Sequence, residues 1–353
     1  AFTHSDPIDL VSLDTKFGGM TLIESIQRSP IAFETGSGQA LAADWGASGA
    51  LAEVLTGIGG CSPYLCELLR KEQDWLAEAV TLAAPLQNLL PEDSDNDIGA
   101  GLRRAKRRVA GFLAMAEVSG AYSLAQSTQA LTDFADQAVQ LAFSSALAPY
   151  QASGKLPEET GLFVIAMGKM GAGELNYSSD IDLVVMFDDR DMDHFEAAQR
   201  RQILVRATRA ATKLLNDITE HGYVFRTDLR LRPDPSVTPV CVAMSSALDY
   251  YESLGRTWER AAFIKARVCA GNRKAGAEFL DQMVPFVWRR YLDFAAIEEA
   301  HALRLKIRTK TGARGAVHVP GHDVKLGRGG IREIEFFTQT RQLISGGRDA
   351  ELR

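Results

Sequence analysis

Residues 162–187 constrain the fold of this chain more than any other stretch, because two apolar runs flank a glycine-rich turn that leads into two aspartates. Side chains alternate along a β-strand, so Asp180 and Asp182 point to one face of the second run and Ile181 points to the other. Two carboxylates ~7 Å apart on a strand, beside a flexible turn, can hold a hard divalent cation. Magnesium bound to the phosphates of a substrate suits such a site.

A third carboxylate follows in residues 223–232, where charged and apolar residues alternate. Arg226, Asp228, Arg230 and Arg232 fall on one face of this run. The pattern predicts a half-buried strand with an ionic face, ended by Pro233. Three arginines around one aspartate suit a site that takes phosphates near a metal. The opposite face carries Phe225, Thr227, Leu229 and Leu231.

The two motifs are more informative together than apart. An isolated Asp-x-Asp sequence is common, and a charged strand face is usually just solvated. Their combination with a glycine-rich turn and an intervening helix favours a catalytic site. The glycines follow the spacing Gly-x-x-Gly-x-Gly, which is not that of dinucleotide-binding loops. The turn is not a Walker loop either, because Gly168-Lys169 is followed by Met170 rather than by Ser or Thr.

These residues resemble the nucleotidyltransferase superfamily that includes DNA polymerase beta, in which a Gly-Ser pair or a variant of it precedes an Asp-x-Asp pair and a third Asp. Lys169 stands here where Ser is common in the superfamily. The run from Gly168 to Asp182 is similar, more narrowly, to the bifunctional glutamine synthetase adenylyltransferase/deadenylylase family. Further similar segments are residues 61–65, 68–70, 102–108, 228–233, 250–251, 255–256, 258–260, 264–267, 324–327, 329–336 and 346–348.

The resemblance implies an activity. Enzymes of this family contain two nucleotidyltransferase halves: one attaches AMP to a tyrosine of glutamine synthetase, and the other removes it by phosphorolysis, giving ADP. Several segments look like the first, adenylyl-removing half. One Asp triad is present, so we expect one active centre in a fragment of a longer protein. Asp180 and Asp182 would hold one or two Mg²⁺ ions, and Asp228 would complete the second metal site or act as a base.

The expected phosphate and nucleotide contacts fall into two groups. Near the triad they are Gly168, Lys169, Ser179, Arg226, Arg230 and Arg232. Beyond it, Arg256 and Arg260 are spaced to share one helix face, and Lys265 and Arg267 follow closely. Surface ion pairing is the alternative for these residues in isolation, and the resemblance favours a phosphate or AMP contact for Arg260, Lys265 and Arg267.

Three alternatives to the removing reaction stay open. The same centre could run forward and move AMP from ATP to a tyrosine, or the chain could be a polymerase-type nucleotidyltransferase. It could also be a regulatory module that senses a signalling protein such as PII, in its uridylylated form. Expected partners are therefore glutamine synthetase, PII, AMP or ADP, and phosphate.

Composition limits the other classes of function. The chain has 353 residues, 46% of them hydrophobic, and a net charge of −6, which argues against a protein that mainly binds nucleic acid. No apolar run of about 18 residues predicts a membrane span. The four cysteines form no Cys-x-x-Cys pair and no zinc-ligand spacing is seen, so a reduced, cytoplasmic protein is expected.

The predicted fold class is α+β, with a polymerase-beta-like nucleotidyltransferase domain, a small mixed sheet with helices, between helical domains. The expected boundaries are residues 1–149 for the N-terminal helical domain, 150–245 for the catalytic domain and 246–353 for a truncated C-terminal helical domain. We expect a helix at 195–219 capped by Gly222, a second helix at 331–345, and a break at Pro149. The basic run 102–108 reads as a solvated face or as a contact for an acidic partner.

Overall fold

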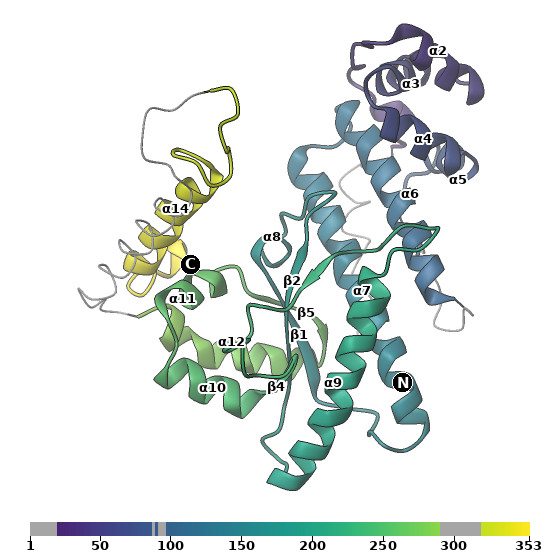
Figure 1. Ribbon diagram of the computed structural model, residues 1–353. Helices are drawn as coiled ribbons and strands as arrows, with labels where there is room; N and C mark the ends of the chain where they lie inside the picture. Colours follow the sequence, from purple (N-terminus) through teal and green to yellow (C-terminus); the bar gives the residue numbers. More distant parts are fainter. Residues whose placement is uncertain (1–19, 87–88, 91–96, 290–318) are drawn as a thin grey trace.

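The computed structural model describes residues 20–86, 89–90, 97–289 and 319–353 (Figure 1). The helices are α2 (Thr35–Asp44), α3 (Gly49–Cys61), α4 (Pro63–Lys71), α5 (Gln73–Ala79), α6 (Ile98–Val118), α7 (Leu124–Ala152), α8 (Gly168–Gly171), α9 (His194–Asn216), α10 (Met244–Ser253), α11 (Thr257–Phe263), α12 (Arg273–Val287) and α14 (Ile331–Ser345). The strands are β1 (Leu162–Met167), β2 (Ile181–Phe187), β3 (Thr227–Asp228), β4 (Cys241–Ala243) and β5 (Arg267–Gly271).

The strands form one small mixed sheet, which confirms the α+β fold class. Its order is β3-β2-β1-β5, with β4 also paired to β2. β1 runs antiparallel to β2 and to β5, whereas β3 and β4 run parallel to β2. The two short strands lie along the same edge of β2, with β3 at its first two residues and β4 at its last three. This register brings the motif strands side by side.

Helices cover both faces of the sheet, and this is why β1 and β2 are continuous apolar runs. Leu183, Val185 and Phe187 of β2 point into a core shared with α7 and α9. Val184 and Met186 point into a second core, shared with α10 and α12. The alternation that places Val184 in the second core places Asp182 on that side of the sheet as well.

Two expected helix ends are corrected by the structure. α9 ends at Asn216 rather than at residue 219, although its apolar face packs on the sheet as predicted. The break expected at Pro149 is wrong, because α7 continues through this proline to Ala152. A proline so near the end of a helix removes one backbone donor, and the remaining turn persists. The helix predicted at 331–345 is confirmed as α14.

The basic run 102–108 on α6 faces the interior, so the solvated face expected there is largely wrong. Arg103 is buried and donates to the carbonyl oxygens of Leu214 and Asp217 at the end of α9, and to that of Gly222. Helix ends leave such carbonyls unsatisfied. Arg103 therefore caps the C-terminal end of α9, the role that we expected of Gly222. Two further arginines of the run, Arg107 and Arg108, pair with the buried carboxylate of Glu72.

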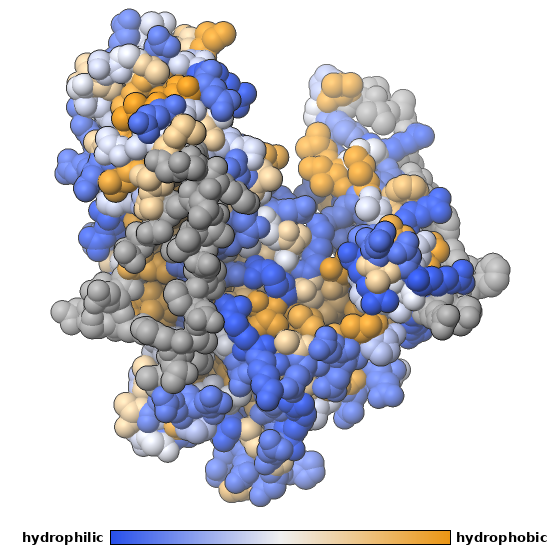
Figure 2. Space-filling model, turned by 180° about the vertical axis from the view of Figure 1, so that it is seen from behind, coloured by the Kyte–Doolittle hydropathy of each residue, from blue (hydrophilic) through white to orange (hydrophobic). Residues whose placement is uncertain are grey.

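Two arms stand on either side of the sheet: helices α2 to α6 form one, and the segment with α14 forms the other (Figure 1). A hollow separates them when the molecule is seen from behind (Figure 2). All four cysteines are free thiols, as expected. Within the described ranges, no helix has both the length and the apolar character needed to cross a membrane.

Candidate active site

Asp182 occupies the centre of the predicted motif. It pairs with Met167 at the end of β1 and with Asp228 of β3 in the strand register. Gly168 follows Met167 in the chain and has a φ of +56°. A Cβ on Gly168 would lie 2.7 Å from a carboxylate oxygen of Asp182. Glycine is therefore required here both by its backbone conformation and by the space that the carboxylate occupies.

The other two aspartates are held by arginines. Arg226 Nε donates to Asp180 at 2.5 Å, and its Nη2 donates to the carbonyl oxygen of Ser178 at 2.7 Å. Arg230 donates to both carboxylate oxygens of Asp228. Within the described residues, Asp182 forms no ion pair, so two of the three carboxylates are neutralised by protein groups and one is not.

The three carboxylates lie close enough to influence one another. The pKa of Asp182 is raised above its usual value, first by burial and then by the negative charges of Asp228 and Asp180. The pKa of Asp228 is lowered, chiefly by the hydrogen bonds from Arg230. The triad predicted from sequence is thus gathered at one edge of the sheet, with a concentration of negative charge that a divalent cation would relieve.

The residues present fit a divalent cation. Carboxylate oxygens are the ligands that Mg²⁺ prefers, and strand pairing sets Asp182 directly beside Asp228. In the described part of the chain, however, no group of three or more His, Cys, Asp or Glu side chains is arranged to hold a metal ion. The reason is visible in the ion pairs, since Asp180 and Asp228 turn toward Arg226 and Arg230.

The strand expected over 223–232 is far shorter than predicted, because β3 contains Thr227 and Asp228 alone. The Asp228 carboxylate accepts a hydrogen bond from the backbone N–H of Arg230, a local turn that ends strand pairing. Leu229 then packs against the core beneath α7 and α9, whereas Leu231 packs against the other core. The predicted alternation therefore fails after Leu229.

Arg232 consequently does not share a strand face with the triad. Its guanidinium donates to the carbonyl oxygens of Leu229, Pro235 and Thr238. It braces the turn that follows β3, and its charge contributes to the low pKa of Asp228.

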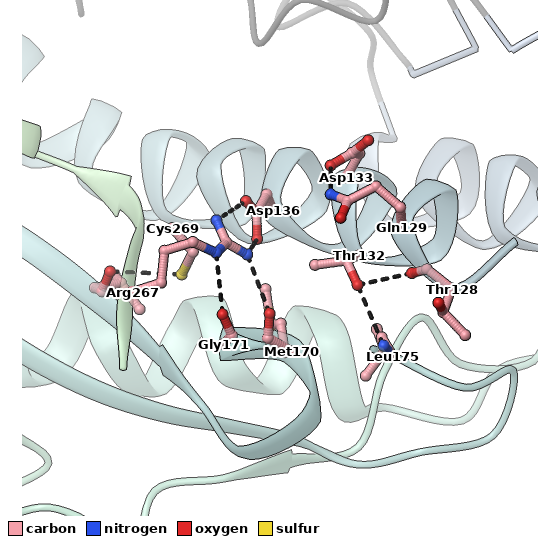
Figure 3. A network of polar contacts seen from close by, with 11 residues as sticks. Thr128, Gln129, Thr132, Asp133, Asp136, Met170, Gly171, Leu175, Arg267 and Cys269 are labelled. Carbon is pink, nitrogen blue, oxygen red and sulfur yellow. Dashed lines mark hydrogen bonds and ion pairs between the residues drawn. The ribbon is translucent and has the colours of Figure 1, made fainter. Parts of the chain in front are cut away.

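The guanidinium of Arg267 lies between α7 and the glycine-rich turn (Figure 3). It forms an ion pair with the buried Asp136 of α7 and donates to the carbonyl oxygens of Met170 and Gly171. Thr132 of the same helix accepts a hydrogen bond from the backbone N–H of Leu175, at 3.2 Å. Arg267, predicted to contact phosphate, is engaged in positioning this turn on α7.

Arg260 is the clearest departure from the predicted site. It is 2% exposed and donates to the carbonyl oxygens of Phe286 and Val287 at the end of α12. A side chain buried in this way cannot reach a phosphate, so the phosphate contact predicted for Arg260 is wrong. The helical spacing of Arg260 from Arg256 did not indicate that Arg260 is buried. Its burial depends on packing against the end of α12, which is distant in the sequence.

Lys265, Lys169 and Ser179 lie on the rim of the site. Lys265 bridges Glu174 of the glycine-rich turn, at 3.4 Å, and Glu335 of α14, at 3.0 Å. Lys169 is exposed and Ser179 is half-buried on the same turn. Lys169 and Ser179 are chain neighbours of Gly168 and Asp180, and Lys265 reaches the same turn through Glu174; the phosphate contacts predicted for these three residues stay predictions.

Lys325 is a candidate site residue that sequence reasoning missed. Its positive charge partly opposes the rise in the pKa of Asp182. Lys325 therefore lies near the triad, although it is 143 positions from Asp182 in the sequence. The backbone N–H groups of Ile331 and Arg332 donate to the carbonyl oxygens of Val324 and Lys325, which fixes the lysine at the start of α14. Lys325 belongs to a segment of the family resemblance, and that was the available signal.

Comparison with known proteins identifies the family of this chain. Residues 42–282 match the protein family described as glutamate-ammonia ligase adenylyltransferase. The chain belongs to this family. Its members are nucleotidyltransferases, which confirms the class of enzyme predicted from the motifs. Residues 301–352 match a second description, GlnD PII-uridylyltransferase, and the part of that match at 301–318 falls outside the described residues.

Curated relatives give the same result. A protein of Bradyrhizobium sp. strain BTAi1 is 45% identical over 327 residues, covering 87% of this chain and 33% of the relative. A protein of Rhodopseudomonas palustris strain CGA009 is 46% identical over 318 residues, covering 85% and 32%. Both are named bifunctional glutamine synthetase adenylyltransferase/adenylyl-removing enzyme. The chain thus spans about a third of the length of the relatives it matches.

Proposed function

We propose that this chain is the adenylyl-removing centre of such a bifunctional enzyme. It would use orthophosphate to remove AMP from an adenylylated tyrosine of glutamine synthetase, giving ADP and the free tyrosine, in the cytoplasm. The observation that carries this proposal is the convergence of Asp180, Asp182 and Asp228 at one sheet edge, with Arg226 and Arg230 beside them.

The reaction exchanges one oxygen for another at phosphorus. A phosphate oxygen forms a bond to the adenylyl phosphorus while the bond from phosphorus to the tyrosine oxygen breaks, and the phenolate takes a proton from solvent. Asp180, Asp182 and Asp228 would hold one or two divalent cations, with Mg²⁺ the ion that fits these ligands. A bound Mg²⁺ supplies charge neutralisation and orientation at the phosphoryl oxygens.

The side chains of the site perform the remaining tasks. Arg226 and Arg230 are exposed and can turn from their carboxylates to bind phosphate oxygens, for which a planar guanidinium is well suited. Gly168 leaves space for Asp182, and Arg267 holds the turn that carries Gly168. Positioning and charge, rather than covalent chemistry by the protein, account for such a transfer.

A chemical argument supports the proposed removal of AMP over its attachment. A tyrosine hydroxyl that attacks ATP needs a base, whereas orthophosphate is already an anion and does not. In the proposed site Asp228 would be engaged as a cation ligand, so it would be poorly placed to act as a base as well. The forward reaction is therefore the second candidate, supported by the bifunctional names of the relatives.

One experiment distinguishes the two directions. The chain is incubated with adenylylated glutamine synthetase, Mg²⁺ and phosphate, and ADP is measured by chromatography. In parallel it receives unmodified glutamine synthetase and ATP, and pyrophosphate is measured. We expect ADP in the first mixture, formed far more slowly by the Asp182→Asn variant. Pyrophosphate in the second mixture, without ADP in the first, would replace our proposal with the forward reaction.

We further propose that a PII-type protein regulates the centre, most favourably in its uridylylated form. The match of residues 301–352 to a PII-modifying enzyme supports this, as does the contact of α14 with the rim of the site through Glu335 and Lys265. The test is the phosphate-dependent rate with uridylylated or unmodified PII added. Equal rates in both mixtures would remove PII from the proposal.

A further inference from the structure

A pocket outside the triad lies between the N-terminal arm and the catalytic sheet. It has a volume of about 790 Å³, within the range of specific binding sites. Its walls come from α4, from α6 and from two turns, at 177–178 and at 220–223. The triad uses none of these lining residues.

The pocket adjoins the catalytic centre through one side chain. Arg226 donates to the carbonyl oxygen of Ser178 and to the hydroxyl of Tyr223, and both residues line the pocket. The same guanidinium donates to Asp180 of the triad. A molecule in the pocket is therefore separated from the carboxylates by one residue, and a substrate bound at the triad has this space beside it.

The chemistry of the walls indicates a peptide. Leu65, Leu68 and Ala114 give an apolar surface, and Tyr64 adds an aromatic ring that is 68% exposed. Acidic residues accompany the basic ones around this surface, namely Glu67, Glu117 and Glu220 with Lys71 and Arg107. The carboxylates disfavour a second nucleotide, whose phosphates they would repel, whereas apolar contacts with charges of both signs suit a polypeptide segment.

Lys106 also lines the pocket, but its amine is directed toward the buried rings of Phe134 and Phe225. The side chain comes from α6, and its Nζ is buried without a hydrogen-bond partner. The amine lies 3.7 Å from the ring centre of Phe225, which leaves its hydrogen-bonding capacity unused. Because this amine is not accessible from the pocket, Lys106 forms part of the wall without bonding to a ligand, and the basic contacts of the pocket come from Lys71 and Arg107.

We propose that this pocket binds the peptide segment that flanks the modified tyrosine of the protein substrate. The inference rests on the proposed function, since it assigns a docking site for the same reaction. The tyrosine ester would lie at the triad, and the neighbouring residues of its chain would pass Arg226 and lie against Tyr64 and α6.

The test compares two substrates of the same centre. One is adenylylated glutamine synthetase; the other is the AMP ester of N-acetyltyrosine amide, which lacks a flanking peptide. Tyr64→Ala should raise KM for the protein substrate about tenfold, as for an aromatic contact residue, with a smaller change in kcat. Its KM for the small ester should equal that of the wild type. Phe195→Ala is the matched control, because Phe195 is 70% exposed on α9 and lies outside the pocket.

A second variant keeps the test independent of one side chain. Ala114→Trp fills the pocket from α6, and Ala210→Trp on an exposed position of α9 is its control. If neither Tyr64→Ala nor Ala114→Trp raises KM for the protein more than its control, or if both substrates lose activity equally, the docking proposal is wrong. If wild-type protein releases no ADP from either substrate, the proposed function itself has failed.

Discussion

Replacing Arg267 by methionine tests whether the glycine-rich turn depends on its anchor to α7. The change removes the ion pair with Asp136 and two hydrogen bonds to the carbonyl oxygens of Met170 and Gly171. Asp136 is 5% exposed, so its carboxylate would remain buried without a partner. We therefore expect loss of both stability and activity.

The size of the loss follows from this environment. Removing one partner of a fully buried pair costs about 3–5 kcal/mol. Arg267 itself is 37% exposed, so water screens part of the interaction, and we expect the lower end, about 3 kcal/mol. Burial already raises the pKa of Asp136, which lets the orphaned carboxyl gain a proton and limits the loss. For a domain of this kind, about 3 kcal/mol lowers Tm by roughly 6–12 °C.

Thermal and urea unfolding followed by circular dichroism measure this effect. Asp136→Asn added to Arg267→Met should recover part of the loss, because no buried charge then remains. Phosphate-dependent ADP release should stay low in the double variant, since the turn still lacks its anchor. A Tm within 1 °C of the wild type for the single variant, or no recovery in the double one, would refute the reasoning.

Three further predictions concern other parts of the molecule. Asp182→Asn should lower kcat by on the order of 10²–10³ at unchanged Tm, because it removes a metal ligand charge from a half-buried position; an unchanged ADP release rate would remove it from the triad. Arg230→Ala should raise the apparent KM for phosphate about tenfold, whereas Arg260→Ala should instead lower Tm, a contrast that steady-state kinetics and calorimetry reveal. Burial lowers the pKa of Lys106 to about 7 in the folded protein. Above that pH the unfolded chain binds more protons than the folded protein does, so wild-type stability should rise from pH 7 toward pH 10. Lys106→Met should be more stable at pH 7 by about 2 kcal/mol, after allowing for the lost cation–π contact, and should lack this rise in urea titrations at both pH values.

The parts of the fold that the sequence predicted depend on local patterns. Two apolar runs of strand length and a strict alternation at Asp180 and Asp182 indicated β2, the triad and the paired strand. The helix at 331–345 carried its own end signals, including Gly346. These features require no knowledge of distant residues, and the structure contains them, except that β2 begins at Ile181, so Asp180 precedes the strand.

The parts that were missed depend on partners far along the chain. The sequence around Arg103, Arg260 and Arg267 shows a positive charge, whereas the structure shows three guanidinium groups that satisfy carbonyl oxygens at helix ends and in a turn. A charged residue alone does not reveal whether its partner is a phosphate or a backbone carbonyl. Pro233 predicts an end of the strand after Arg232, whereas β3 ends at Asp228, where the Arg230 N–H donates to the Asp228 carboxylate.

The ion pairs of Asp180 with Arg226 and of Asp228 with Arg230 have a thermodynamic consequence. A cation that takes either carboxylate releases a guanidinium group, and a phosphate that takes a guanidinium group releases a carboxylate. The cation therefore makes the binding free energy of phosphate more favourable, and phosphate does the same, by an equal amount, for the cation. A centre of this design discriminates against either ion alone and becomes competent when both are present.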